Sequence, residues 1–132
     1  MNPVLIDFKD LSDYRGGLVS LEENKNIPFT IRRVYYLFGT DTDVRRGFHA
    51  HKTLKQVAVC VKGACTFLLD DGHSRSTTRL SSPHKGLYIS NILWREMFDF
   101  TDDCVLMVLA SEYYDESDYI REYDDFIEQV HA

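Results

Sequence analysis

Short apolar or alternating runs recur along this chain, and each ends at a turn signal. Turn-forming residues at Gly16-Gly17, Lys62-Gly63, Asp71-Gly72 and 81–83 separate runs such as "FTIRRVYYLF", "KQVAVCV", "CTFLLD" and "CVLMVLA". Many short strands at a spacing of about ten residues are typical of a sandwich or barrel. The Asp71-Gly72 pair predicts a hairpin between "FLLD" and "RSTTRL", because a tight turn needs a positive φ. The sequence therefore predicts an all-β barrel.

Only the end of the chain has a helical pattern. Ile120, Tyr123, Ile127 and Val130 are spaced three and four apart, which predicts a helix over 117–130 with Ser117 as its cap. We expect this helix to lie against the outside of the barrel. The 132 residues are enough for one domain, 1–132, with a core and a ligand-sized cavity.

Charge and hydropathy exclude several classes of partner. The net charge is −6, and the Lys and Arg residues are scattered, which argues against nucleic acid and anionic membranes. No apolar stretch approaches the roughly 18 residues of a membrane span, and the first ten residues do not resemble a signal peptide. We expect a cytoplasmic protein in which Cys60, Cys65 and Cys104 remain reduced and pack as small apolar groups.

The stretch "RRGFHAHKTLKQVAVCVKG" carries the strongest chemical signal. His49 and His51 are two apart at the start of an apolar run, so on a strand they point to the same face. Such a pair could bind a metal or act as acid and base. The small Ala58 and the polar Gln56 would point the same way, which indicates a polar cavity floor. Buried structural histidines are the alternative interpretation.

The spacing His49-x-His51-x4-Gln56-x6-Gly63 resembles the first motif of the cupin superfamily, with Gln56 in place of a glutamate. In the comparable second motif, "SPHKGLYISN", Tyr88 and Ile89 stand where metal-binding cupins have a third histidine. Two protein ligands rarely hold a transition metal. We therefore predict acid/base chemistry and no metal.

Basic and aromatic residues upstream suit a phosphate-bearing ligand. In "IRRVYYLFG", Arg33 and Tyr35 share one face of a strand, and an Arg beside a Tyr can bind a phosphate. Arg46, just before the histidines, could close on a diphosphate. Core packing for Tyr35 and a solvated charge for Arg46 are the alternatives.

Over almost the whole chain, the segments "RRVYYLFGT", "RRGFHAHK", "LKQVAVCVKG", "LLDDG" and "VLMVLASEYYDESDYIREYDDF" are similar to the dTDP-4-dehydro-6-deoxyglucose 3,4-ketoisomerases. The resemblance implies a metal-independent and cofactor-independent cupin, a double-stranded β-helix or jelly-roll barrel. It implies a dTDP-linked 4-keto-6-deoxy sugar as substrate and a homodimer whose N-terminal strands, 1–10, are exchanged. Some members have a histidine where this chain has Arg95.

The residues support such a reaction. Moving a ketone from C4 to C3 requires removal of the C3 proton, formation of an enediol and reprotonation at C4, and imidazoles can do both near neutral pH. In this hypothesis His51 removes the C3 proton and His49 carries the transfer, although the division could be reversed. Tyr35 would bind the enediolate. The expected substrate-binding residues are Arg33, Arg46, Gln56, Tyr88, Trp94 and Arg95, with Trp94 or Tyr88 either stacking on thymine or simply filling the core.

Other functions remain open from the sequence. The dTDP-sugar 3,5-epimerases, which are related metal-free cupins with a histidine base, are the nearest alternative. A non-catalytic sugar-binding cupin and a metal-dependent dioxygenase or isomerase are two further possibilities. Solvent deuterium entering the sugar would exclude the non-catalytic sugar-binding cupin. Activity that persists after chelation would exclude the metal-dependent enzyme.

Overall fold

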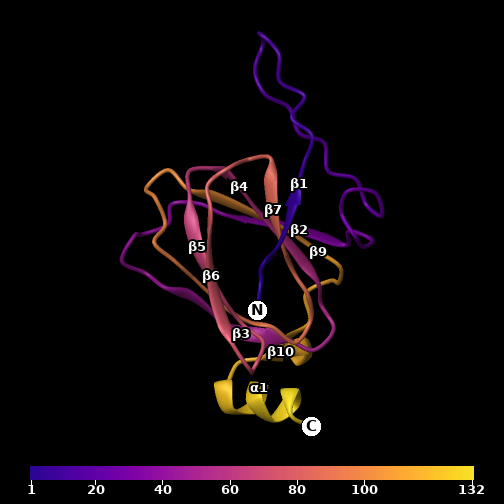
Figure 1. Ribbon diagram of the computed structural model, residues 1–132, viewed down its shortest axis with the longest axis vertical. Coiled ribbons are helices and arrows are strands. Elements are labelled where there is room, and N and C mark those ends of the chain that lie inside the picture. The colour runs from indigo at the N-terminus through magenta and orange to yellow at the C-terminus, as the bar shows by residue number, and fades with distance from the viewer.

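The computed structural model describes residues 1–132 as two five-stranded antiparallel sheets that close into a barrel (Figure 1). The first sheet has the order β1 (Val4–Asp7), β7 (Lys85–Ile89), β4 (Gln56–Lys62), β9 (Val105–Ala110), β2 (Arg33–Leu37). The second sheet has the order β10 (Tyr119–Ile120), β3 (Arg46–His51), β8 (Trp94–Phe98), β5 (Cys65–Asp70), β6 (Arg75–Leu80). The predicted all-β, jelly-roll class is confirmed.

The main core fills one part of the barrel interior, where the inward faces of both sheets meet. Its buried members are Ala58, Cys60, Cys65, Phe67, Leu69, Leu80, Leu87, Ile89, Phe100, Cys104, Leu106 and Val108. Alternate residues of β4 point the other way, and Val57 and Val59 pack beneath Phe8, Ile27 and Phe29 of the N-terminal segment. Because both faces of β4 are covered, its sequence is almost continuously apolar.

The predicted hairpin joins β5 to β6. Gly72 adopts φ +89°, and a Cβ at this position would lie 2.7 Å from a methyl group of Val130. A glycine is therefore required by the backbone conformation and by the close approach of the C-terminal helix. The C-terminal helix, which covers part of the second sheet, therefore packs directly against this turn.

The C-terminal helix is shorter than the sequence predicted. Helix α1 covers Tyr123–Val130, whereas the preceding residues form a 3₁₀ turn, η1 (Glu116–Asp118), and the short strand β10. Ser117 is not a helix cap but donates its amide to the Asp115 side chain at 3.0 Å. The chain leaves the helical path because β10 pairs with β3 and the Asp118 carboxylate binds the loop after β3.

The N-terminal strand β1 pairs with β7 of its own chain, from Val4 opposite Tyr88 to Asp7 opposite Lys85. The segment after it projects from one end of the barrel, and α1 lies at the other end (Figure 1). No helix has the length and apolar character needed to cross a membrane.

Candidate active site

A β-bulge in β3 sets the position of the two histidines. Gly47 and Phe48 both have positive φ, +96° and +59°, and the register of β3 with β8 shifts between Gly47 and His49. A Cβ at Gly47 would lie 2.8 Å from the Arg95 carbonyl oxygen, so only glycine permits this approach. The bulge leaves His49 directly opposite Arg95.

His49 and His51 lie on the same face, as the spacing predicted. Their ring centroids are 4.9 Å apart, and the rings are nearly perpendicular at 85°. Tyr119 of β10 packs against both, with its centroid 5.0 Å from His49 and 4.3 Å from His51. The two imidazoles therefore form one unit at the inner face of the barrel.

His51 is fully buried, and its two ring nitrogens have different surroundings. Nδ1 lies 3.2 Å from an Asp118 carboxylate oxygen, whereas Nε2 is buried without a hydrogen-bond partner. Burial, followed by the charge of Arg95, lowers the pKa of His51 to about 3 despite the nearby carboxylate. The imidazole is therefore neutral near pH 7.

His49 is half-buried, and its Nδ1 lies 3.2 Å from the Gly47 carbonyl oxygen. A carbonyl only accepts, so Nδ1 carries the hydrogen and Nε2 has the free lone pair. Burial and the charge of Arg95 lower the pKa of His49 to about 4. Near neutral pH the site thus contains two uncharged imidazoles.

A hydrogen-bonded chain lies beside the histidines and joins three strands. The Gln56 amide nitrogen donates to the Tyr35 hydroxyl at 2.9 Å, and an Arg95 guanidinium nitrogen donates to the Gln56 amide oxygen. Arg95 is 2% exposed and donates its other hydrogen bonds to the Leu93 carbonyl. All of its acceptors are neutral, and burial lowers its pKa to about 10. A buried cation therefore faces the histidines without a carboxylate partner.

Asp118 and Tyr119 also belong to the site, although neither was predicted from the sequence. Both lie within the acidic, tyrosine-rich segment after β9, whose helix-like spacing from residue 117 onward suggested a helix on the outside of the barrel. The available signal was that this segment contains an unusual density of tyrosine and acidic residues, "SEYYDESDYIREYDDF". Local periodicity does not predict that part of this segment pairs with β3, because that contact joins residues far apart in the sequence.

Two arginines expected to bind phosphate have different positions. Arg33 is half-buried, its guanidinium lies 5.1 Å from the Tyr35 ring centroid and 5.6 Å from that of Tyr114, and its Nε has no partner. Arg46 is exposed and lines a separate pocket formed mainly by residues 37–44. The structure therefore joins Arg33, and not Arg46, to Tyr35.

Two aromatic residues expected to bind substrate pack outside the barrel interior. Tyr88 points to the outer face of the first sheet and packs against the Phe8, Ile27 and Phe29 cluster, because its neighbours Leu87 and Ile89 occupy the interior. Trp94 packs beneath α1, 5.3 Å from the Tyr123 ring centroid. Each fills an outer core, which is the alternative that the sequence left open for both, and a contact of either residue with the substrate stays a prediction.

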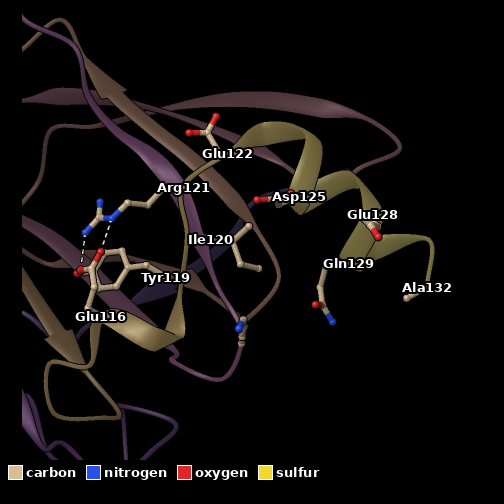
Figure 2. Close-up of a pocket in the computed structure, with 10 residues that line it drawn as sticks. Glu116, Tyr119, Ile120, Arg121, Glu122, Asp125, Glu128, Gln129 and Ala132 are labelled. Atoms are coloured by element: carbon tan, nitrogen blue, oxygen red, sulfur yellow. Dashed lines mark hydrogen bonds and ion pairs between the residues drawn. The ribbon is translucent and has the colours of Figure 1, made fainter.

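A pocket of about 510 Å³ opens between η1, β10 and α1 (Figure 2). Glu116 and Arg121 form an ion pair at its inner end, with N–O distances of 2.7 and 2.8 Å. The Arg121 guanidinium lies 4.2 Å from the Tyr119 ring centroid. Tyr119 thus separates this outer pocket from the histidines.

This arrangement is suited to moving protons. Two neutral imidazoles can accept and return a proton, and the buried guanidinium can stabilise a negative charge that develops beside them. The same guanidinium disfavours a metal cation at the histidine pair, because it would repel a second positive charge in a buried site. The Gln56 side chain already makes hydrogen bonds with Tyr35 and Arg95, so it is not free to act as a third metal ligand.

Comparison with known proteins identifies relatives along the whole chain. The family model described as "WxcM-like, C-terminal" (FdtA) matches residues 1–131. The TDP-4-oxo-6-deoxy-alpha-D-glucose-3,4-oxoisomerase of Aneurinibacillus thermoaerophilus is 57% identical over 126 residues, covering 96% of this chain and 91% of that relative.

Solved structures with the same fold are also similar in sequence. A variant of the 3,4-ketoisomerase QdtA from Thermoanaerobacterium thermosaccharolyticum, in complex with TDP-4-keto-6-deoxyglucose, has a TM-score of 0.95 and 49% identity, covering 98% of this chain and 94% of that one. A 3,4-ketoisomerase from Helicobacter canadensis has a TM-score of 0.96 and 42% identity, covering 100% of this chain and 99% of that one.

Proposed function

This chain belongs to the WxcM-like, C-terminal (FdtA) family, and from that premise we infer that it is a sugar-nucleotide 3,4-ketoisomerase. It converts dTDP-4-keto-6-deoxyglucose to a dTDP-3-keto-6-deoxyhexose. The C3 proton of the substrate is acidic, because the C4 carbonyl takes up the charge when the proton leaves. Protonation of the resulting enediol at C4 leaves the ketone at C3, so the reaction requires only proton transfers.

The observation that carries the proposed mechanism is the free, buried Nε2 of His51 beside His49. We assign removal of the C3 proton to His51 Nε2, and transfer of protons between the two carbons or their oxygens to His49. Low pKa values keep both imidazoles neutral and ready to accept a proton. Negative charge developing on the sugar raises the proton affinity of His51 at the step that needs it.

Arg95 and Tyr35 are proposed to stabilise the enediolate. The guanidinium donates only to neutral acceptors, so its charge is not compensated by a protein carboxylate. Gln56 holds it in place and also donates to the Tyr35 hydroxyl, which leaves that hydroxyl free to donate to a sugar oxygen. Preorganised donors of this kind typically contribute 10²- to 10³-fold each to kcat.

We propose that the Arg33 guanidinium binds the diphosphate of the substrate. Its guanidinium lies beside the Tyr35 and Tyr114 rings, and the unpartnered Nε is available to an acceptor. Replacement by Lys would keep the charge but lose the planar fork that binds two phosphate oxygens. An Arg33→Lys variant is therefore expected to raise KM and the Kd of dTDP with a small effect on kcat.

We also propose that the enzyme is a cytoplasmic homodimer with exchanged N-terminal strands, in which β1 pairs with β7 of the other subunit in place of β7 of its own chain. The edge strand β2 and its extension expose Val34, Tyr36 and Phe38 at 52%, 63% and 71%, an apolar stripe suited to burial in an interface. Three buried thiols with sulfur separations of 3.5 and 3.9 Å are typical of a reducing compartment. Light scattering should give twice the 15.4 kDa chain mass, and a Tyr36→Glu, Phe38→Glu variant should be monomeric. A monomeric wild-type protein would contradict this proposal.

Asparagine variants test the roles of the histidines. His51→Asn should reduce both isomerisation and exchange of the C3 proton with deuterated solvent to a trace, because the base is lost. His49→Asn should lose product formation but retain some exchange at C3, since the enediol still forms and returns to substrate. Both should bind dTDP. Exchange that survives only in His51→Asn would reverse the assignment, and full activity in both would exclude the histidines from the mechanism.

A further inference from the structure

The acidic segment from Asp115 to Arg121 has no role in the mechanism so far, although it lies directly over the histidines. Strand β10 pairs Tyr119 with His51, and the Lys52 amide donates to the Asp118 carbonyl oxygen at 2.9 Å. These backbone contacts bring a carboxylate that is 67 residues away in sequence to the outer side of His51. The position of this carboxylate determines the chemistry of the imidazole.

Four donors surround the Asp118 carboxylate. Oδ1 accepts from the Thr53 amide at 2.9 Å and from the Thr53 hydroxyl at 2.8 Å. Oδ2 accepts from the Leu54 amide at 3.2 Å and lies 3.2 Å from His51 Nδ1. Burial alone would raise the pKa of Asp118, but the Thr53 and Leu54 hydrogen bonds lower it below its ordinary value. The group is therefore a carboxylate at neutral pH, and it can only accept hydrogen bonds.

An acceptor on one side of the ring fixes the hydrogen on that side. His51 Nδ1 must donate to Asp118, so Nε2 has a lone pair, and this nitrogen is the buried atom without a partner. The opposite tautomer would set two lone pairs against each other at Nδ1 and place an unbonded N–H in the site. Both effects are unfavourable in a buried environment.

We propose that Asp118 is the positioning residue of the ketoisomerase reaction, holding His51 with Nε2 as the base and stabilising the imidazolium that forms. This inference rests on the proposed function. When the C–H bond at C3 breaks, its electron pair enters the enediolate and the proton binds His51 Nε2. The imidazolium then lies between the enediolate and the Asp118 carboxylate, which remains ionised. Return of the proton to carbon restores the neutral pair.

The other charged and titratable groups around His51 make this carboxylate necessary. Arg95 from β8 and His49 from β3 both disfavour a positive charge on His51, and Tyr119 from β10 packs against the ring. Asp118 is the acidic group in contact with the imidazole. Without it, the cation formed during proton transfer would face Arg95 in a buried site without compensation.

The test is Asp118→Asn. The amide keeps an oxygen for Thr53, but its nitrogen donates to His51 Nδ1 and therefore moves the ring hydrogen to Nε2. We expect kcat and C3 exchange to fall about 10²- to 10⁴-fold; the same change of aspartate to asparagine in a Ser-His-Asp triad lowers kcat about 10⁴-fold, because the histidine takes the wrong tautomer. The Kd of dTDP should change less than about threefold, because the nucleotide is bound elsewhere.

Asp115→Asn is the matched control, because it makes the same chemical change in the same segment. The Asp115 carboxylate accepts from the Ser117 amide at 3.0 Å and hydroxyl at 2.7 Å and does not contact a histidine. Its kcat should stay within about threefold of wild type. Equal losses in both variants would mean that the segment has only a structural role, and would overturn the proposal.

Two further measurements test the proposal, and the first uses only wild-type protein, so it does not depend on the folding of Asp118→Asn. Nitrogen-15 NMR of labelled wild-type protein should show hydrogen on His51 Nδ1, and hydrogen on Nε2 would overturn the proposal. In the His51→Asn background, adding Asp118→Asn should cause no further loss of residual activity, whereas a multiplicative loss would show that Asp118 acts through another group. A wild-type protein without ketoisomerase activity would refute the proposed function, whereas an active wild type with an unaffected Asp118→Asn variant would refute only this inference.

Discussion

The depressed pKa values of the two histidines predict how stability depends on pH. In the folded protein the pKa is about 4 for His49 and about 3 for His51, against 6.5 in an unfolded chain. Between the folded and unfolded pKa values, the unfolded state binds more protons than the folded state. The contribution of these histidines to the free energy of unfolding is therefore complete above pH 6.5 and is lost as the pH falls towards the folded-state values. When the pH is lowered from 7 to 5, the free energy of unfolding should decrease by about 2 kcal/mol for each histidine, and by about 4 kcal/mol for the pair.

Urea unfolding followed by tryptophan fluorescence is a suitable assay, because Trp94 is 4% exposed and packs beneath α1. The window from pH 7 to pH 5 lies above the range in which most carboxylates titrate. The His49→Asn, His51→Asn double variant should lose most of the pH dependence, whereas His73→Gln, at an exposed position, should retain it. A wild-type unfolding free energy that changes by less than about 1 kcal/mol across this window would refute the claim that the two imidazoles are buried and neutral.

Three more predictions concern the site itself. Activity should persist in excess chelator, since the buried Arg95 guanidinium disfavours a cation at the histidine pair; loss of activity that one metal restores would contradict this. Gln56→Glu should slow turnover without creating a stoichiometric metal site, because the carboxylate would pair with Arg95 and could no longer donate to Tyr35, and metal analysis of the purified variant checks this. Arg95→Met should lower kcat by about 10²- to 10³-fold through loss of enediolate stabilisation, with little change in the Kd of dTDP, as measured by steady-state kinetics and calorimetry; a kcat within about threefold of wild type would refute the role.

Much of the site was predictable because it depends on local alternation. Two histidines two residues apart on a strand must share a face, and Gln56 and Tyr35 occupy inward positions for the same reason. The prediction needed no knowledge of which strands are neighbours. The barrel class was predictable on similar grounds, from the spacing of strands and turns.

The sequence left two roles open where the pattern of burial has more than one explanation. Tyr88 and Trp94 are apolar residues on strands whose outer faces are also covered, by the N-terminal segment and by α1. Alternation then no longer distinguishes the cavity from an outer core. Asp118 was missed for a different reason, because its pairing with His51 is a long-range contact that local helical spacing conceals.

NMR of the product formed from dTDP-4-keto-6-deoxyglucose in deuterated water shows whether the enzyme moves the ketone from C4 to C3. We expect a sugar nucleotide with its ketone at C3 and solvent deuterium at C4, formed by the purified enzyme without an added cofactor. A ketone that stays at C4 while deuterium enters C3 or C5 would indicate an epimerase. Unchanged, unlabelled substrate would indicate a protein that binds the sugar without turning it over, and either result would show that the protein is not a 3,4-ketoisomerase.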